Sequence, residues 1–210
     1  MNADLDTDAA RVVIATRNEG KLREISEMLE DVDLDVLSLA GFDLTEAEET
    51  GLTFVENAII KARHAARGTG LAAIADDSGL EVDLLHGAPG VQSARYAGTG
   101  AADAENIARL LQELDGAPSE ARTARFRCVM VYLRHAEDPA PIIAQGTWQG
   151  RILSRPRGEN GFGYDPVFFV PSRRCSAAEL DAKTKNRLSH RGQALRSLVA
   201  MLGAEGVAEG

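Results

Sequence analysis

Residues 11–29 read RVVIATRNEGKLREISEML, and this stretch decides the expected fold class. Its first six residues form a short β-branched run that predicts a strand, and residues 17–20 interrupt it. After this break, apolar residues recur at helical spacing, at Leu22, Ile25, Met28 and Leu29. A second strand is predicted over residues 34–39. The chain therefore begins as strand, helix and strand, an order that is typical of α/β proteins.

Further helices and strands are predicted along the rest of the chain. Helices are predicted over residues 54–67, 104–114 and 190–202. Strands are predicted over residues 71–75, 126–133, 142–149 and 166–170. Thr53 and Glu56 form a capping box before the first of these helices, and Ser189 caps the last.

The two strands on either side of residues 134–141 are expected to pair as an antiparallel hairpin, so the sheet should be mixed. No internal repeat or low-complexity linker divides the chain. We therefore predict one α/β unit over residues 11–203. Residues 1–10 are expected to be a solvated leader, and residues 204–210 a tail.

Composition and charge exclude several classes of partner. The 210 residues are 44% hydrophobic but only 5% aromatic, which suits the aliphatic core of an α/β protein. Lys and Arg number 23 against 32 Asp and Glu, and the net charge of −9 opposes binding to a nucleic acid polymer or an anionic membrane. No apolar run reaches the ~20 residues of a membrane helix.

The N-terminal residues and the cysteines indicate a cytoplasmic protein. The first ten residues contain Asp4, Asp6 and Asp8 in place of the basic and apolar segments of a secretory signal. Cys128 and Cys175 are far apart and suggest neither a disulfide framework nor a zinc site. A reducing compartment fits both observations.

Residues 16–21 lie between a predicted strand and the start of a helix, where free N–H groups favour an anion. Thr16 and Asn18 could donate hydrogen bonds to a phosphate, and Lys21 could supply charge. The segment is not a Walker loop, because Ala15 replaces the first glycine and Leu22 replaces the Ser or Thr that binds magnesium. A plain turn with a solvated lysine is an equally good interpretation of this motif alone.

Asp76-Asp77-Ser78-Gly79 follows the strand predicted over residues 71–75, which places the acids at the edge where α/β sheets bind ligands. Neighbouring carboxylates on a buried strand repel each other, so a cation such as Mg²⁺ would keep them ionised. Glu48 and Glu49 offer further oxygen ligands, although a solvated acidic loop is the more ordinary interpretation. Considered alone, Asn57 and Lys61 suit an exposed helix face.

Two later segments suggest binding of a base. Residues 158–165 place two aromatic side chains among glycines, so Phe162 could stack on a purine; a hairpin turn is the alternative. Ser189-His190-Arg191 puts positive charge in the first turn of a helix, where the macrodipole disfavours it. A bound keto group or phosphate would explain the charge, and a solvent-facing arginine is the alternative.

Together these segments resemble the inosine triphosphate pyrophosphatase family, including its bacterial dITP/XTP pyrophosphatases. The resemblance extends from residue 12 to residue 202. It rests on five ordered motifs: Thr16-x-Asn18-x-x-Lys21; Glu48-Glu-Thr-Gly-x-Thr-Phe-x-Glu-Asn57; Ala75-Asp-Asp-Ser-Gly-Leu80 with Pro89-Gly-x-x-Ser-Ala-Arg-Tyr96; Gly161-Phe-Gly-Tyr-Asp-Pro166; and Ser189-His-Arg191.

The resemblance implies an elongated mixed sheet flanked by helices, in two lobes with the site in the cleft between them. It implies a hydrolase that cleaves the α–β phosphate bond of deaminated purine nucleoside triphosphates, with Mg²⁺ and as a homodimer. The implied catalytic residues are Asp77, Lys61 and Asp76, and the implied metal ligands are Glu49 and Asp77. The implied substrate-binding residues are Thr16, Arg17, Asn18, Glu19, Gly20, Lys21, Ser78, Phe162, Gly163, Tyr164, Asp165, Lys185, His190 and Arg191.

Hydrogen-bond chemistry predicts the base selectivity of such a site. Hypoxanthine and xanthine present a keto acceptor at the position where adenine presents an amino donor, so protein donors at that edge would reject ATP. Arg17 is a bulky departure from the family's phosphate loop. Two alternatives remain: a related pyrophosphatase of modified pyrimidine nucleotides, which the Ser-His-Arg segment disfavours, and a regulator that binds the same nucleotides without hydrolysing them.

Overall fold

The computed structural model describes residues 10–30 and 32–207. A seven-stranded sheet runs through it in the order β2-β1-β3-β4-β5-β6-β7. The strands are β1 (Ala10–Ile14), β2 (Leu34–Ser38), β3 (Ala72–Val82), β4 (Thr123–Leu133), β5 (Ile142–Ile152), β6 (Phe168–Val170) and β7 (Cys175–Ser176). β1 is parallel to β2 and β3, whereas all other neighbours are antiparallel. The predicted mixed sheet is confirmed.

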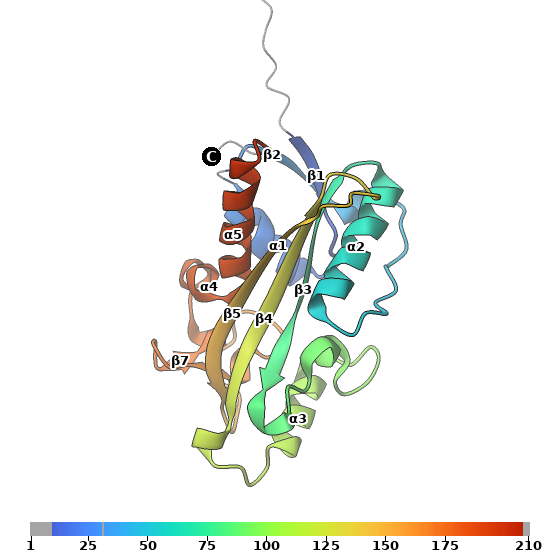
Figure 1. Ribbon diagram of the computed structural model, residues 1–210. Helices are drawn as coiled ribbons and strands as arrows, with labels where there is room; N and C mark the ends of the chain where they lie inside the picture. The colour runs from blue at the N-terminus through green and yellow to red at the C-terminus, as the bar shows by residue number, and fades with distance from the viewer. Residues whose placement is uncertain (1–9, 31, 208–210) are drawn as a thin grey trace, which may run out of the picture.

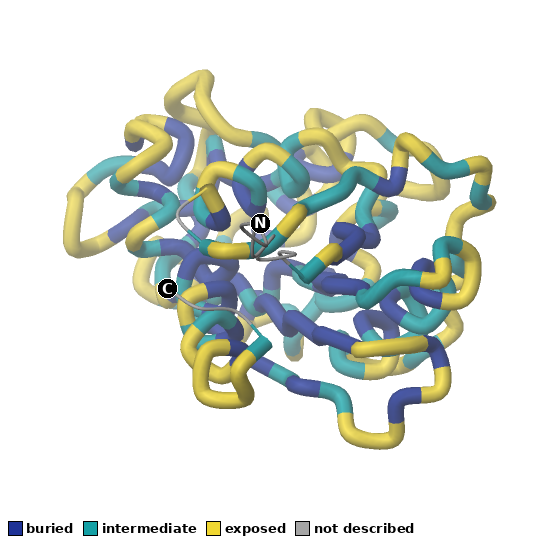
Figure 2. The backbone as a smooth tube through the Cα atoms, turned by 90° about the horizontal axis from the view of Figure 1, so that it is seen from above, coloured by how far each residue is buried: buried dark blue, intermediate teal, exposed yellow. Residues whose placement is uncertain are grey.

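Helices cover both faces of the sheet, with α2 on one side and α1 and α5 on the other (Figure 1). The α-helices are α1 (Glu19–Leu29), α2 (Phe54–Thr69), α3 (Asp103–Glu113), α4 (Ala182–Leu188) and α5 (His190–Ala204). Strand alternation produces this layering: Val12 and Ile14 of β1 pack toward α1 and α5, and Val13 packs toward the alanine-rich side of α2. The buried backbone of the sheet runs between exposed outer loops (Figure 2).

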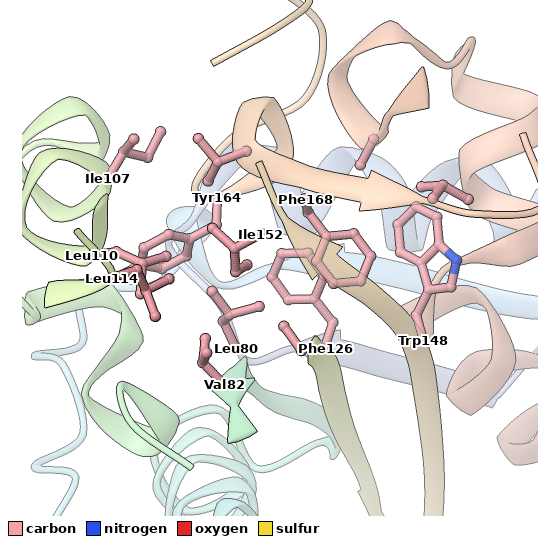
Figure 3. Close-up of a cluster of buried hydrophobic side chains, with 14 of the residues drawn as sticks. Leu80, Val82, Ile107, Leu110, Leu114, Phe126, Trp148, Ile152, Tyr164 and Phe168 are labelled. Atoms are coloured by element: carbon pink, nitrogen blue, oxygen red, sulfur yellow. The ribbon is translucent and has the colours of Figure 1, made fainter. Parts of the chain in front are cut away.

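A separate aromatic cluster forms the core at the far end of β3, β4 and β5. Phe126, Trp148 and Phe168 pack together with the aliphatic side chains of Leu80 and Val82 (Figure 3). Helix α3 closes this cluster with Ile107, Leu110 and Leu114. The long strands therefore connect this cluster with the two apolar layers on the α2 side and on the α1 and α5 side of the sheet, and the middle of β3 lies between them.

The helix ends follow the predicted caps. Thr53 and Glu56 form the capping box of α2, and the Ser189 side chain accepts a hydrogen bond from the backbone N–H of Gly192 at the start of α5. Helix α2 runs past Gly68 to Thr69, and it is capped by Gly70, whose φ of 70° is the left-handed conformation that glycine tolerates.

The largest difference from prediction is the length of β3. The sequence pattern ends this strand at residue 75, but it continues to Val82 and pairs with β4 along the whole of this length. Leu80 and Val82 continue its buried face, which explains the extension. The strand β7 and the short helix α4 are not predicted by the sequence pattern. Ala10 belongs to β1, and the rest of the expected leader lies outside the described residues, as do residues 208–210. None of the described helices is long and apolar enough to cross a membrane.

Candidate active site

Asp76 and Asp77 are adjacent residues in the middle of β3, where they are paired in register with Met130 and Val129 of β4. Because successive side chains of a strand point to opposite faces, the two carboxylates do not share a pocket. The prediction that both lie at the end of a strand and repel each other is wrong. The Asp76 side chain points to the face of the sheet that α1 and α5 cover, where it contacts Lys21 and Arg191. The Asp77 side chain points to the face that α2 covers, where it contacts Lys61.

On the α2 side, Asp77 belongs to a cluster with Lys61 and Glu49. Lys61 Nζ lies 2.7 Å from Asp77 Oδ1 and 3.1 Å from Glu49 Oε1. Glu49 Oε2 lies 3.2 Å from Arg95 Nη1. The fully buried Asn57 holds the adjoining loop, since its Oδ1 accepts a hydrogen bond of 2.9 Å from the Gly51 N–H. Asn57 and Lys61 therefore do not lie on an exposed helix face, whereas Glu48 is exposed.

Burial and charge shift the two carboxyl groups of this cluster in opposite directions. Burial raises the pKa of Asp77 above its ordinary 3.8, although Lys61 and Lys21 act the other way. Burial also disfavours the ionised form of Glu49, but Lys61 and Arg95 outweigh it and lower the pKa of that group. A carboxylate of raised pKa beside a lysine is suited to accept a proton.

On the opposite face, Asp76 is enclosed by cations. Its Oδ2 lies 3.0 Å from Lys21 Nζ and 3.3 Å from Arg191 Nη2. The Ser78 hydroxyl donates to the same oxygen at 3.2 Å and accepts from Arg191 at 2.9 Å. Burial opposes ionisation, but Lys21 and Arg191 hold the pKa of Asp76 well below its usual range. Asp76 is therefore a permanent negative charge that orients two cations.

The phosphate-loop residues surround the start of α1. Asn18 caps the helix, with its Oδ1 accepting from the Lys21 N–H at 2.9 Å, and the Thr16 hydroxyl accepts from the Asn18 N–H at 3.2 Å. The exposed Arg17 donates to the carbonyl oxygen of Leu44, and Glu19 begins the helix.

Gly20 allows residues 16–21 to approach the glycine-rich residues 158–165 closely. A Cβ added at Gly20 would lie 2.6 Å from Cδ1 of Phe162, so only glycine allows this approach. These two segments, which are about 140 residues apart in the sequence, therefore lie in contact.

Three of the predicted base-binding residues, Phe162, Asp165 and Lys185, lie in contact with one another. The ring of Phe162 lies over two cations, 4.9 Å from Lys185 Nζ and 5.5 Å from Arg191 Cζ. Asp165 Oδ2 lies 2.5 Å from Lys185 Nζ and accepts from the Phe162 N–H at 2.9 Å. The Gly163 N–H donates to Asp103 of α3 at 2.6 Å. These bonds fix the loop that carries the Phe162 ring.

His190, Arg191 and Tyr164 are all buried. His190 stacks on Phe126 with 4.7 Å between ring centroids, and burial together with Arg191 holds its pKa well below 6.5, so the imidazole is neutral. Arg191 is only 2% exposed, which excludes a solvent-facing arginine. The Tyr164 hydroxyl donates to the Ser93 carbonyl oxygen at 2.8 Å.

Two neighbouring cavities divide these residues between them. The larger, of about 580 Å³, is lined by Thr16, Arg17, Lys61, His64 and Arg95 among others. The smaller, of about 150 Å³, is lined by Ser78, Phe162, His190 and Arg191 among others. Asn18, Lys21 and Glu49 line both, so the two cavities are parts of one cleft.

A family model matches most of the chain. Residues 12–201 match the model described as the Ham1 family. This chain belongs to the Ham1 family. The dITP/XTP pyrophosphatase of Vibrio parahaemolyticus is 58% identical over 195 residues, which cover 93% of this chain and 98% of the relative. The dITP/XTP pyrophosphatase of Escherichia coli O157:H7 is 56% identical over 192 residues, covering 91% and 98%.

Solved structures of the Ham1 family show the same fold. A HAM1 protein from Coxiella burnetii matches with a TM-score of 0.86 and 51% identity, over 93% of this chain and 99% of its own. A nucleoside-triphosphatase / dITP/XTP pyrophosphatase from Mycobacterium abscessus matches with a TM-score of 0.72 and 42% identity, over 91% and 99%. The predicted fold class is confirmed.

The carboxylates of Glu49 and Asp77 suit a divalent cation. Glu49 and Asp77 both direct an oxygen at Lys61 Nζ, so the two side chains converge on one positive charge. Mg²⁺ is commonly held by one or two carboxylates together with substrate phosphates and water. Within residues 10–30 and 32–207, no group of three or more His, Cys, Asp or Glu side chains could hold a metal. The donor set fits Mg²⁺ that is bound together with a phosphate ligand.

Two residues of this site, Glu24 and Arg95, are not predicted from the sequence. Glu24 is buried on α1 and lies 2.8 Å from Lys185 Nζ and 2.5 Å from Arg191 Nη1. Its only sequence signal is its spacing of three residues from Lys21, which puts both on one side of α1. Arg95 lies within the motif that ends at Tyr96, but nothing in its sequence context indicates a role for it.

Proposed function

We propose that this chain is a nucleoside triphosphate pyrophosphatase that converts ITP, dITP, XTP and dXTP to monophosphate and pyrophosphate. Its relatives at 56–58% identity are named dITP/XTP pyrophosphatases. The observation that carries the proposal is one cleft in which Lys61 lines the larger cavity, Phe162 and Arg191 line the smaller one beside Asp77, and Glu49 lines both. Such an enzyme removes these bases from the nucleotide pool before they enter DNA or RNA.

In this proposal the triphosphate lies along residues 16–21, where Lys21 and Lys61 face phosphoryl oxygens. Asp77 accepts a proton from the water that is added across the α–β anhydride. Asp76 does not touch the reacting atoms. It keeps Lys21 and Arg191 in place from the other face of β3.

We also propose that Mg²⁺ is the cofactor and that Glu49 and Asp77 hold it. The bound ion would offset the negative charge of the phosphoryl groups and lower the pKa of the attacking water. Lys61 lies between the two carboxylates and would keep them oriented before nucleotide and metal enter.

Base selection is assigned to the small, buried end of the cleft. Phe162 provides a flat apolar surface for stacking, and Arg191, which lines the same cavity, provides donors only. Lys185 lines neither cavity and lies 4.9 Å from the centre of the Phe162 ring. A 6-keto acceptor is satisfied by such donors, whereas the amino group of adenine would face donors and find no acceptor. A site built on hydrogen bonds of this kind can discriminate by about 10⁴-fold.

The remaining proposals concern location and assembly. The resemblance to the family supports a homodimer, and an enzyme that acts on the nucleotide pool is expected in the cytoplasm. The acidic net charge of −9 supports small nucleotides over nucleic acid polymers or membranes as partners. Light scattering of the purified chain would test the dimer.

Product analysis tests the proposed function. Purified protein is incubated with Mg²⁺ and separately with ITP, XTP, GTP and ATP, and the nucleotide and phosphate products are resolved. Monophosphate with pyrophosphate, formed preferentially from ITP and XTP, is the expected result. Orthophosphate with diphosphate would contradict the bond choice. No turnover of any of the four nucleotides would favour a regulator that binds them without hydrolysis, or the pyrimidine enzymes.

A further inference from the structure

One stripe of α2 binds the segment of the chain that carries Glu49. Residues 43–51 form neither helix nor strand, and they run beside α2 (Figure 1). Three side chains at positions i, i+4 and i+7 of the helix each pair with one residue of this segment: Asn57 with Gly51, Lys61 with Glu49, and His64 with Thr45. Because residues at this spacing lie on one face of a helix, the segment is held along a single side of α2. Glu49 lies between the two outer contacts.

The contact between Asn57 and Gly51 is buried and closely packed. Asn57 is fully buried, and its Oδ1 accepts from the Gly51 N–H at 2.9 Å. A Cβ added at Gly51 would lie 2.6 Å from Glu56 Cβ and 2.7 Å from Asn57 Oδ1, so only glycine allows this approach. Asn57 Nδ2 has no hydrogen-bond partner among the described residues. A buried donor without a partner costs free energy, so packing alone does not explain an asparagine here, and its amide acts through the bond to Gly51.

The neighbouring capping box serves the helix itself. Glu56 is exposed, and its Oε2 accepts from the N–H groups of the two residues that precede α2, at 2.9 Å each. Asn57 instead binds Gly51, which is two residues from Glu49. Substitutions at the cap and at Asn57 therefore separate the stability of α2 from the position of Glu49.

The position of Glu49 matters because it shares Lys61 with Asp77. Lys61 Nζ lies 2.7 Å from Asp77 Oδ1 and 3.1 Å from Glu49 Oε1. Asp77 is fixed by the sheet, since β3 pairs with β4 on both sides of it. Glu49 is on an irregular segment, so its distance from Asp77 depends on how that segment is anchored. Residues that orient a metal ligand typically change metal affinity by about 10- to 100-fold when they are replaced.

We propose that Asn57 is a positioning residue, which fixes residues 49–51 so that the Glu49 carboxylate converges with that of Asp77. This inference rests on the proposed function, in which these two carboxylates hold Mg²⁺. Asn57 touches neither the nucleotide nor the ion, because it acts through Gly51. Without its Oδ1, the Gly51 N–H loses its partner and Glu49 can move away from Asp77. Binding of a phosphate ligand together with Mg²⁺ is then weakened, whereas binding of the ligand to the cleft lysines is not.

The test is the affinity for inorganic pyrophosphate, measured by titration calorimetry with and without Mg²⁺. Asn57→Leu keeps a branched side chain but removes the acceptor. With Mg²⁺ it should weaken pyrophosphate binding by about tenfold, and without Mg²⁺ its affinity should stay within about twofold of wild type. The matched control is Thr53→Ala, which removes the cap of the same helix and keeps the bond to Gly51. That variant should bind pyrophosphate as wild type does in both conditions.

Gly51→Ala tests the same contact from the side of the segment. Its Cβ would force residues 49–51 away from α2, so it should weaken binding in the same Mg²⁺-dependent way. Equal weakening with and without Mg²⁺ would show that Asn57 supports the cleft as a whole and would overturn the proposal.

Wild-type affinity of both variants in the presence of Mg²⁺ would also overturn the proposal. If wild type releases pyrophosphate from ITP or XTP while the variants bind as wild type does, this inference alone fails. If wild type released none, the proposed function would fail, and this inference with it. Thermal unfolding verifies that each variant is folded at the temperature of the titration.

Discussion

We propose a base end of the cleft, around Phe162 and Arg191, and a phosphate end, around Lys61 and Glu49. Both ends carry acidic and basic side chains, but these differ in how far they are buried. At the base end, the side chains of Glu24, Asp165, Lys185 and Arg191 are only 3–10% exposed. At the phosphate end, those of Lys61, Glu49 and Arg95 are 14–34% exposed, around a cavity almost four times larger. Charges of both signs alternate at each end, so composition alone does not distinguish them.

Burial determines what each cluster can do. Buried ions require complete pairing and resist rearrangement, because an unpaired buried charge is costly. In the proposed function, the base end therefore presents a rigid set of donors that would discriminate between bases. The phosphate end is partly exposed, and in the proposed function its cations would exchange a carboxylate for a phosphoryl oxygen at low cost. Rigidity suits selection, and exchangeable pairing suits a highly charged substrate.

The largest expected effect is at the phosphate end. Replacing Asp77 with Asn preserves the shape of the side chain but removes the proposed proton acceptor, so kcat for ITP should fall by about 10³-fold, within the range for general bases. Steady-state kinetics with ITP measures the change. The matched control is Asp35→Asn, since Asp35 pairs with Arg11 at the exposed edge of the sheet. Retention of more than a tenth of the wild-type kcat would contradict the role of Asp77.

The second effect is on stability at the base end. Glu24→Gln leaves Lys185 and Arg191 without one of their buried carboxylates, so the free energy of unfolding at neutral pH should fall by about 3 kcal/mol. Denaturant unfolding measures it, with Glu27→Gln on the exposed side of α1 as the control.

The pH dependence of this difference has a defined sign. Burial disfavours the Glu24 carboxylate, but Arg191 and Lys185 outweigh it and lower its pKa below 4.5. Its contribution is therefore complete above pH 4.5 and is lost as the pH falls through the lowered pKa. The wild type and Glu24→Gln should converge in stability at acid pH. A difference that grows on acidification would be inconsistent with this ion pair.

The third effect concerns stacking. Phe162→Ala removes the flat surface at the base end, and base stacking on an aromatic side chain contributes about 1–3 kcal/mol. The KM for ITP should rise by about tenfold, with a smaller change in kcat. The affinity for pyrophosphate, which has no base, should remain unchanged. A loss of pyrophosphate binding would show that Phe162 supports the phosphate loop through Gly20 instead.

The smallest expected effect is a difference in stability between two variants that each lack one helix cap. Ser189→Ala removes a buried cap at the start of α5, and Thr53→Ala removes an exposed cap at the start of α2. Each cap should contribute about 1 kcal/mol to the free energy of unfolding. The buried cap should cost more, because its removal leaves the Gly192 N–H without access to water. Equal losses in thermal unfolding would contradict this difference.

Local patterns in the sequence predict most of the fold. Helical periodicity, the Thr53 capping box and the hairpin of β4 and β5 depend on neighbouring residues, and the structure contains all of them. The opposite directions of Asp76 and Asp77 are not predicted, because the apolar run of β3 stops just before them. The alternation of Leu80 and Val82 is the signal that continues the strand, and the two faces follow from it.

The site is predictable to a different degree at its two ends. The short motifs that mark the phosphate loop and the acids indicate nucleotide and metal chemistry from neighbouring residues alone. The pairing of Glu24 with Arg191 joins residues 167 positions apart. No local signal specifies such a pair, since it depends on how α5 packs beside α1.

The most direct test of the division between the two ends is the ratio of kcat/KM for ITP to that for ATP. It is measured for wild type, the phosphate-end variant Lys61→Met and the base-end variant Arg191→Lys. Lys61→Met should lower both values together and leave the ratio within about threefold of wild type, whereas Arg191→Lys should lower the ratio by about tenfold or more, because a single ammonium replaces a planar fork of donors. A ratio that collapses in Lys61→Met, or survives in Arg191→Lys, would contradict the assignment of selection to the buried end.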